Sequence, residues 1–91
     1  MTPGEVAAAI EQFVRTQFRV ALSDSRFSRS QPLFDGGYVD SVGVVELLAF
    51  IRQKFAVEVP DEDLMSDQFG TIDGMAAVVA RLYRGPAAGG G

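Results

Sequence analysis

The spacing of apolar residues is the feature that most restricts the fold of this chain. In three stretches these residues recur at intervals of three and four, as they do on one face of an α-helix. Nowhere do apolar and polar residues alternate for long enough to indicate a β-strand. The pattern therefore predicts long helices at about 3–18, 41–55 and 71–83. Their expected core residues are Val6, Ile10, Phe13, Val14 and Phe18 in the first helix, Val44, Leu47, Leu48, Ile51 and Phe55 in the second, and Ile72, Met75, Ala76, Val79 and Leu82 in the last.

The expected helix starts carry residues suited to capping. Thr2 can cap the first helix through its hydroxyl, with Pro3 at the first helical position and Glu5 three residues after the cap. Asp40 occupies the corresponding position before the second helix. Three acidic residues at 61–63 indicate the start of a short helical turn. Together these elements predict an all-α fold, a four-helix bundle with three main helices and one short one.

A long connection separates the first two predicted helices. From residue 23 to residue 38 the helical spacing disappears, and Ser, Arg, Asp, Gly and Pro dominate. Connections of this length in compact domains usually carry function or are held by a few buried side chains. We expect Leu33 and Phe34 to anchor this connection to the core, and Gly36-Gly37 to turn the chain.

Composition excludes most catalytic and metal-binding functions. The chain has no cysteine and no histidine. It therefore has no thiol nucleophile and lacks the residue most often used as a general base and zinc ligand. The Gly-x-Ser-x-Gly elbow of serine hydrolases is also absent. The carboxylates at 61–63 lack the spacing and the glycine of a calcium loop, so we expect a protein that is not an enzyme and has no metal site.

Length and charge restrict the domain organisation and the partners. A chain of 91 residues fits one domain, expected at 1–84, and the Gly/Ala-rich sequence at 85–91 indicates a flexible tail. The net charge of −4 would repel a nucleic acid backbone. The N-terminus lacks the pattern of a secretory signal, and no segment is long enough to span a membrane. We therefore expect a cytoplasmic monomer with neither nucleic acid nor membrane as a partner.

One run of the chain carries the strongest functional pattern. Asp40-Ser41 ends the long connection, and the second predicted helix follows directly. Leu33-Phe34 and Gly37 precede this pair, and the step Glu46-Leu47 follows it. The whole run resembles the modification site of acyl and peptidyl carrier proteins. A second Asp-Ser pair, Asp24-Ser25, has no amphipathic helix after it, and we assign it no function.

The resemblance covers nearly the whole chain. Phe55–Pro60 looks like the step out of the family's second helix, and Asp67–Ile72 looks like the entry to its last one. Gly43 stands where many fatty-acid carriers have an aspartate. The D-alanyl carriers of cell-wall modification and the single carriers of polyketide and peptide antibiotic pathways share this variant. The resemblance therefore implies a discrete acyl or aminoacyl carrier with the bundle of acyl carrier proteins and a long first loop.

The resemblance also implies a covalent cofactor and a set of partner enzymes. A phosphopantetheinyl transferase that uses coenzyme A and magnesium would attach 4'-phosphopantetheine to Ser41. The terminal thiol of this arm would then hold the cargo as a thioester. An acyltransferase or an adenylating enzyme would load the arm, and a downstream synthase would receive the cargo.

Elementary chemistry is consistent with this position for the arm. A serine in the first turn of a helix lies next to unpaired N–H groups and the positive end of the helix dipole, where a phosphodiester is stabilised. The chain has no histidine, and Asp40 is too weak a base to deprotonate an alcohol, so Ser41 must be activated by another protein. Asp40 is expected to cap the helix and to contact a partner.

One side of the second predicted helix begins beside Ser41 and combines small apolar residues with one carboxylate. The resemblance implies that this side is the docking surface for partner enzymes, whose basic groups would meet Glu46. The alternative is that its apolar members are buried by the last helix or by the loop. The residues of this expected partner face are Val42, Val45, Glu46, Ala49 and Gln53.

The sequence leaves the pathway and the cargo open. The arginine-rich composition favours polyketide or non-ribosomal peptide biosynthesis of an antibiotic over D-alanylation of the cell wall. The partner enzyme, more than the carrier, selects the cargo. An armless helical interaction domain is the remaining alternative, because a carrier-like fold does not by itself require an arm.

Overall fold

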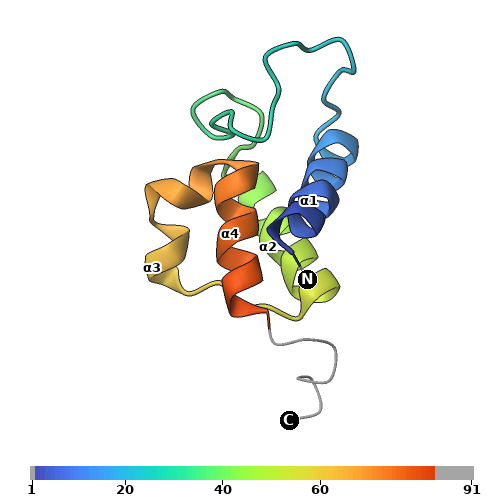
Figure 1. Cartoon of the computed structure of the whole chain (residues 1–91). Helices are drawn as coiled ribbons and strands as arrows, with labels where there is room; N and C mark the ends of the chain where they lie inside the picture. The colour runs from blue at the N-terminus through green and yellow to red at the C-terminus, as the bar shows by residue number, and fades with distance from the viewer. Residues whose placement is uncertain (1, 84–91) are drawn as a thin grey trace.

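The chain forms a helical bundle in the computed structural model, which describes residues 2–83 (Figure 1). No strand occurs between residues 2 and 83, so the predicted all-α fold is confirmed. A short 3-10 helix is present in addition to the predicted elements, and the predicted tail at 85–91 lies outside the described residues. The elements are the α-helices α1 (Pro3–Gln17), α2 (Ser41–Phe55), α3 (Asp61–Leu64) and α4 (Ile72–Leu82), and the 3-10 helix η1 (Asp67–Gly70).

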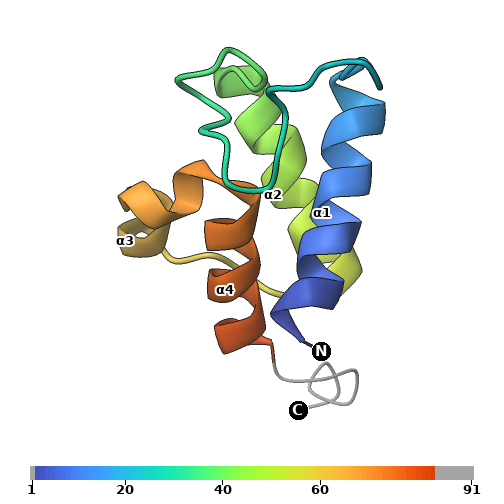
Figure 2. The same cartoon turned by 45° about the horizontal axis from the view of Figure 1, so that its top comes forward.

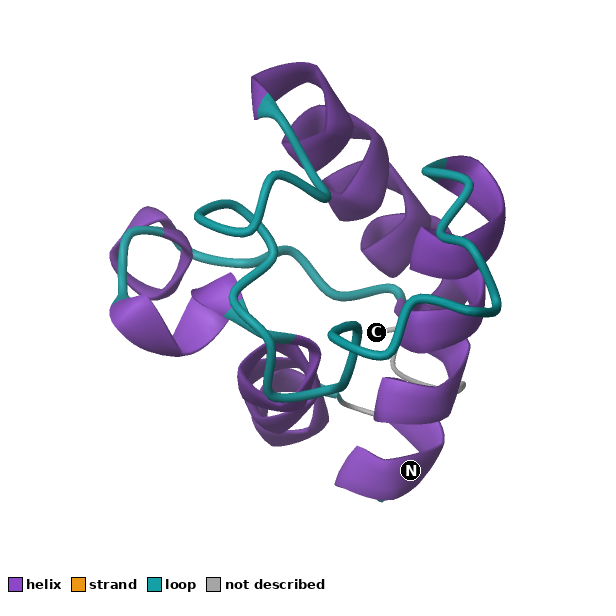
Figure 3. Cartoon of the chain, turned by 90° about the horizontal axis from the view of Figure 1, so that it is seen from above, coloured by secondary structure: helices purple, strands orange, loops and turns teal. Residues whose placement is uncertain are grey.

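The three long helices pack side by side. α1 contacts both α4 and α2, and the chain direction in α2 and α4 is opposite to that in α1 (Figure 2). The elements α3 and η1 lie beside α4, on the side away from α1 (Figure 1). The long connection between α1 and α2 crosses the end of the bundle at which α2 begins (Figure 3). The start of α2 is therefore next to this loop.

Capping residues define where the long helices begin. Thr2 and Glu5 form a capping box, because the Glu5 N–H donates to Thr2 Oγ1 at 3.2 Å and the Thr2 N–H donates to Glu5 Oε1 at 2.9 Å. Asp40 caps α2 through Gly43, and Thr71 caps α4 through its hydroxyl. These side chains satisfy N–H groups that have no partner within the helix.

The core is built largely from the predicted helix faces. Within them, Phe13, Phe18, Val44, Leu48 and Leu82 are only half-buried, which corrects their assignment to the core. These residues lie at the edges of apolar stripes that are wider than the covered part of each helix. Besides Leu33, six buried hydrophobic residues were not selected by the spacing of the three stretches. They are Ala7, Phe27, Val39, Val57, Phe69 and Val78.

The long connection is anchored differently from the prediction. Leu33 is fully buried, as expected, but Phe34 is 37% exposed, so its predicted role as an anchor is wrong. Leu33 is the first residue of a turn in which the next side chain points outward, and Phe27 and Val39 supply the additional buried contacts. The predicted turn is present, since Gly37 has φ +79°, a left-handed conformation that favours glycine.

Polar contacts hold the connection against α1 and α4. Glu11 on α1 accepts hydrogen bonds from Nε of Arg15 at 3.0 Å and from Nε of Arg29 at 2.8 Å. The Arg15 guanidinium also lies 4.5 Å from the ring centre of Phe27, a cation–π contact. The Asp73 N–H at the start of α4 donates to the Arg29 carbonyl at 2.9 Å. Glu11 is thus shared by a helix residue and a loop residue.

Replacing Glu11 by glutamine is expected to lower the free energy of unfolding at neutral pH by up to about 1 kcal/mol. The hydrogen bonds from Arg29 and Arg15 lower the pKa of Glu11 in the folded protein. This stabilisation is therefore present above the unfolded pKa of about 4.5 and is lost as the pH falls through the lowered folded pKa. Urea unfolding between about pH 7 and pH 3 should show a smaller acid-induced loss for Glu11→Gln than for the native chain.

Glu58→Gln is the matched control for Glu11→Gln. The ion pair between Arg52 and Glu58 is 3.9 Å long, and its side chains are 66% and 83% exposed. Removing so exposed a pair should change the free energy of unfolding by less than about 0.5 kcal/mol at neutral pH. A Glu11→Gln variant whose stability matched that of the native chain at every pH would show that Glu11 does not stabilise the loop.

Candidate functional site

Ser41 is the first residue of α2, and it is exposed at the loop end of the bundle. Asp40 before it has an extended backbone, with φ −98° and ψ −174°, so the helix begins sharply at Ser41. Oδ1 of Asp40 accepts a hydrogen bond from the Gly43 N–H at 2.8 Å. The carboxylate of Asp40 is thus directed to the backbone of the same turn that presents the Ser41 hydroxyl.

The backbone around Ser41 favours an anionic group. The first N–H groups of a helix have no carbonyl partner within it, and Asp40 satisfies only that of Gly43. No acidic residue lies within the first turn of α2, and the helix dipole places partial positive charge there. A phosphodiester at Ser41 would therefore lie where the helix stabilises negative charge, so the residues present fit a phosphopantetheine arm.

Main-chain hydrogen bonds hold the segment that leads to Ser41. The Leu33 carbonyl accepts hydrogen bonds from the N–H groups of Tyr38 at 2.9 Å and Val39 at 3.2 Å. The Leu33 N–H donates to the carbonyl of Gly70 in η1 at 2.9 Å. The side chain of Val39 is buried. The chain that enters α2 is therefore fixed to the core and to η1 just before the exposed serine.

The second Asp-Ser pair has a structural role in the long connection, which the sequence did not indicate. Oδ2 of Asp24 accepts a hydrogen bond from the Tyr38 hydroxyl at 2.8 Å, and Oδ1 accepts one from the Arg26 N–H at 2.9 Å. The bond from Tyr38 lowers the pKa of Asp24 because it stabilises the carboxylate. The same bond raises the pKa of Tyr38 because the phenol proton is held by an anion.

The residues of the expected partner face differ in their exposure. Val42 and Val45 are each 67% exposed, and Gln53 is also exposed. Glu46 and Ala49 are half-buried, and Glu46 accepts a hydrogen bond from Nε2 of Gln17 on α1. The face therefore offers two open valines near Ser41, whereas its only carboxylate is turned toward α1.

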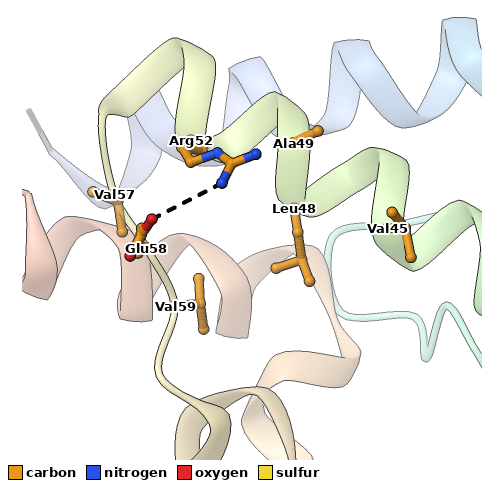
Figure 4. A pocket seen from close by; sticks show the side chains of 7 residues that line it. All are labelled: Val45, Leu48, Ala49, Arg52, Val57, Glu58 and Val59. Atoms are coloured by element: carbon orange, nitrogen blue, oxygen red, sulfur yellow. Dashed lines mark ion pairs between the residues drawn. The ribbon is translucent and has the colours of Figure 1, made fainter.

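Two shallow grooves flank this part of α2. One, of about 330 Å³, lies between α2 and the segment that follows it, and the side chains of Leu48 and Val59 point into it (Figure 4). The ion pair between Arg52 and Glu58 lies at one end of this groove (Figure 4). The other groove, of about 240 Å³, lies between α1 and α2 and includes Glu46. The floor of the first groove is mostly apolar, and its remaining lining residues are Val45, Ala49 and Val57.

An all-α bundle that exposes a serine at the start of its second long helix has the architecture of a carrier domain, as the sequence resemblance implied. Residues 5–79 match the family described as phosphopantetheine attachment site. The chain belongs to this family. It is a carrier protein and not an enzyme, and 4'-phosphopantetheine is its covalent prosthetic group.

The chain is similar to carriers from two kinds of bacteria. It is 34% identical over 77 residues to the probable acyl carrier protein PigG of Serratia sp. strain ATCC 39006, covering 85% of this chain and 87% of that protein. It is 31% identical over 75 residues to the D-alanyl carrier protein of Streptococcus pyogenes serotype M5, covering 81% and 95%. Over 78 residues it is 27% identical to that of Streptococcus sanguinis, covering 86% and 95%. No solved structure is matched.

No helix between residues 2 and 83 is both long enough and apolar enough to span a membrane. The longest, α1 and α2, contain 15 residues each. A spanning helix needs about 20 predominantly apolar residues.

Proposed function

We propose that Ser41 is the residue that carries the phosphopantetheine arm. The observation that carries this proposal is the exposed position of Ser41 as the first residue of α2, directly after the Asp40 cap. A transferase can reach a hydroxyl in this position, and the phosphate that results is stabilised by the N-terminus of a 15-residue helix. When bound, the arm supplies a terminal thiol on which acyl groups are held as thioesters.

The residues of this chain present Ser41 but do not activate it. Asp40 directs its carboxylate to the Gly43 N–H, and the chain contains no histidine or cysteine. The proton of the Ser41 hydroxyl must therefore be removed by a base on the phosphopantetheinyl transferase. In this proposal the chain contributes an ordered helix start, an accessible oxygen and a surface on which the transferase can dock.

The proposal is tested by the mass of the intact protein. The chain is incubated with coenzyme A, magnesium and a broad-specificity phosphopantetheinyl transferase, and the modified protein is fragmented to locate the added group. We expect one phosphopantetheine per chain, on the peptide that contains Ser41. A folded chain that gained no mass, or that gained it at another residue, would refute the assignment of Ser41.

The two groups of similar proteins support two candidate cargo pathways. The chain acts as a discrete acyl or aminoacyl carrier in polyketide or non-ribosomal peptide biosynthesis, supported by its similarity to the probable acyl carrier protein PigG and by seven arginines against one lysine. Similarity to D-alanyl carrier proteins favours a second candidate, a carrier of D-alanine in cell-wall modification. Its partners are the transferase, a loading acyltransferase or adenylating enzyme, and a downstream synthase.

The two pathways are distinguished by which loading enzyme uses the modified chain. The armed protein is incubated with ATP and D-alanine in the presence of a D-alanine-activating enzyme, and in parallel with adenylating enzymes and acyltransferases of antibiotic pathways. Efficient thioester formation in the second set alone would support the natural-product pathway. Efficient loading with D-alanine alone would replace that pathway by cell-wall modification.

The exposed valines beside Ser41 give a test of the partner face. Val45→Asp is expected to leave the fold intact, because the side chain is 67% exposed, and to raise the KM for arm transfer about tenfold. Leu22→Asp is the matched control, since Leu22 is an equally apolar residue that is 94% exposed in the long connection. Equal KM values for the native chain and both variants would exclude Val45 from the surface that the transferase contacts.

A further inference from the structure

Gly43 lies in a notch that has no room for a side chain. It is buried in the first turn of α2, two residues after Ser41. A β-carbon at this position would lie 2.7 Å from Cε1 of Phe18 and 2.9 Å from Cγ1 of Val39. Both distances are far shorter than an ordinary carbon–carbon contact of about 3.5 to 4.0 Å. The ring of Phe18 therefore occupies the space that any other residue at position 43 would need.

The ring of Phe18 is itself held in place. Phe18 is the C-cap residue of α1, and its N–H donates to the Val14 carbonyl at 3.0 Å. The ring packs edge-on against that of Phe13, with centroids 6.1 Å apart and planes at 86°. Phe18 thus connects the end of α1 to the beginning of α2. A shift of this ring changes the surface on which the first turn of α2 rests.

Gly43 also takes part in the hydrogen bond that shapes the Ser41 turn. Its N–H donates to Oδ1 of Asp40 at 2.8 Å, and the Val44 N–H donates to the Asp40 carbonyl at 3.0 Å. Ser41 is the first helical residue of this turn, and Gly43 is the third. A side chain that pushed Gly43 away from Phe18 would move the cap, the free N–H groups and the Ser41 hydroxyl together.

We propose that Phe18 and Gly43 are a matched positioning pair for arm transfer to Ser41. This inference rests on the proposed function of Ser41. Phe18 acts through the glycine rather than by touching the transferred group. The Phe18 ring fixes the position and orientation of the first turn of α2. The ring can pack against this turn because the residue at position 43 has no side chain. The effect of a side chain at position 43 on arm transfer therefore depends on the size of the side chain at position 18.

The coupling is measured with Gly43→Ala, Phe18→Leu and the double variant. Gly43→Ala should displace the Phe18 ring and lower kcat/KM for arm transfer about tenfold, mainly through kcat, because Val42 and Val45 stay available to the transferase. Phe18→Leu in the same chain removes the nearer of the two close contacts, while Cγ1 of Val39 stays in place. The double variant should therefore regain most of the activity that Gly43→Ala loses.

Controls separate positioning from loss of stability. Gly4→Ala adds a methyl group near the start of α1, where the nearest atom is Thr2 Oγ1 at 3.9 Å, and should leave transfer unchanged. Rates are measured at a temperature at which thermal unfolding shows every variant to be folded. Hydrogen exchange of the backbone amide at position 43 is a readout that does not depend on arm transfer. This exchange should be faster in Gly43→Ala than in the native chain, and it should slow again in the double variant.

The outcomes of these measurements test the positioning pair separately from the assignment of Ser41. Native kcat in a folded Gly43→Ala variant would refute the positioning pair and leave Ser41 as the attachment residue. If the fold reduction in kcat/KM of the double variant equals the product of the reductions in the two single variants, the two sites are independent. This result would also refute the pair. If the native chain itself gained no arm at Ser41, the proposed function would fail, and the positioning role would fail with it.

Discussion

Ser41→Ala is expected to abolish attachment of the phosphopantetheine arm, whereas Ser25→Ala should be modified like the native chain. The two serines form a matched pair, because each follows an aspartate and each is exposed. They differ in local structure, since Ser41 begins a 15-residue helix and Ser25 lies in the connection between α1 and α2. Only at Ser41 does a helix N-terminus stabilise the added phosphate.

The environment of Asp24 explains why its serine should not be modified. Asp24 accepts hydrogen bonds from the Tyr38 hydroxyl and the Arg26 N–H, so it closes a loop turn and does not cap a helix. Intact mass after incubation with the transferase and coenzyme A gives the result for both variants. Modification of Ser41→Ala, or loss of modification in Ser25→Ala, would contradict the assignment.

The sequence predicted the elements of this fold because its helices are amphipathic and locally capped. The spacing of residues such as Ile10, Leu47 and Val79 indicates a buried stripe, and the structure buries all three. The Thr2 capping box is also a local pattern, since both partners lie within four consecutive residues. Information of this kind is contained in a short window of sequence, so it can be interpreted without the tertiary structure.

The packing of the long connection could not be predicted in the same way. Its buried residues, such as Phe27 and Val39, have no periodic spacing, and their burial depends on contacts with distant elements. The interpretation of Phe34 as an anchor failed for this reason, because an apolar side chain in a turn does not reveal which way it points. Tertiary contacts, such as that of the Leu33 N–H with Gly70, fix its direction.

The candidate site shows the same division between local and tertiary information. The position of Ser41 after Asp40 and before an amphipathic stretch was apparent from the sequence. The contact of Gly43 with Phe18 was not, because these residues are far apart in the sequence and glycine has no side chain whose pattern could indicate burial. The turn of Glu46 toward Gln17 likewise depends on how α1 packs against α2.

Gly74→Ala is expected to lower the free energy of unfolding by at least about 3 kcal/mol, near the upper end for added volume in a packed site. Gly74 is the third residue of α4, and its N–H donates to Thr71 Oγ1 at 3.0 Å. A β-carbon there would overlap the carbonyl oxygen of Gln68 and lie 2.6 Å from its carbonyl carbon. Backbone atoms cannot rotate away as a side chain can, so η1 and α4 must separate or the cap must break.

Gly70→Ala is the matched control, because Gly70 belongs to the same η1–α4 corner and a β-carbon on it would meet nothing within 4 Å. Its expected effect is within about 0.5 kcal/mol of zero. Urea unfolding of both variants gives the comparison, and arm transfer to folded Gly74→Ala gives a second readout. Because the Gly70 carbonyl accepts the Leu33 N–H, separation of η1 from α4 would also loosen the segment that leads to Ser41. Equal stability of the two variants would mean that η1 moves freely relative to α4, and the close contact at Gly74 would then contribute nothing to the rigidity of the site.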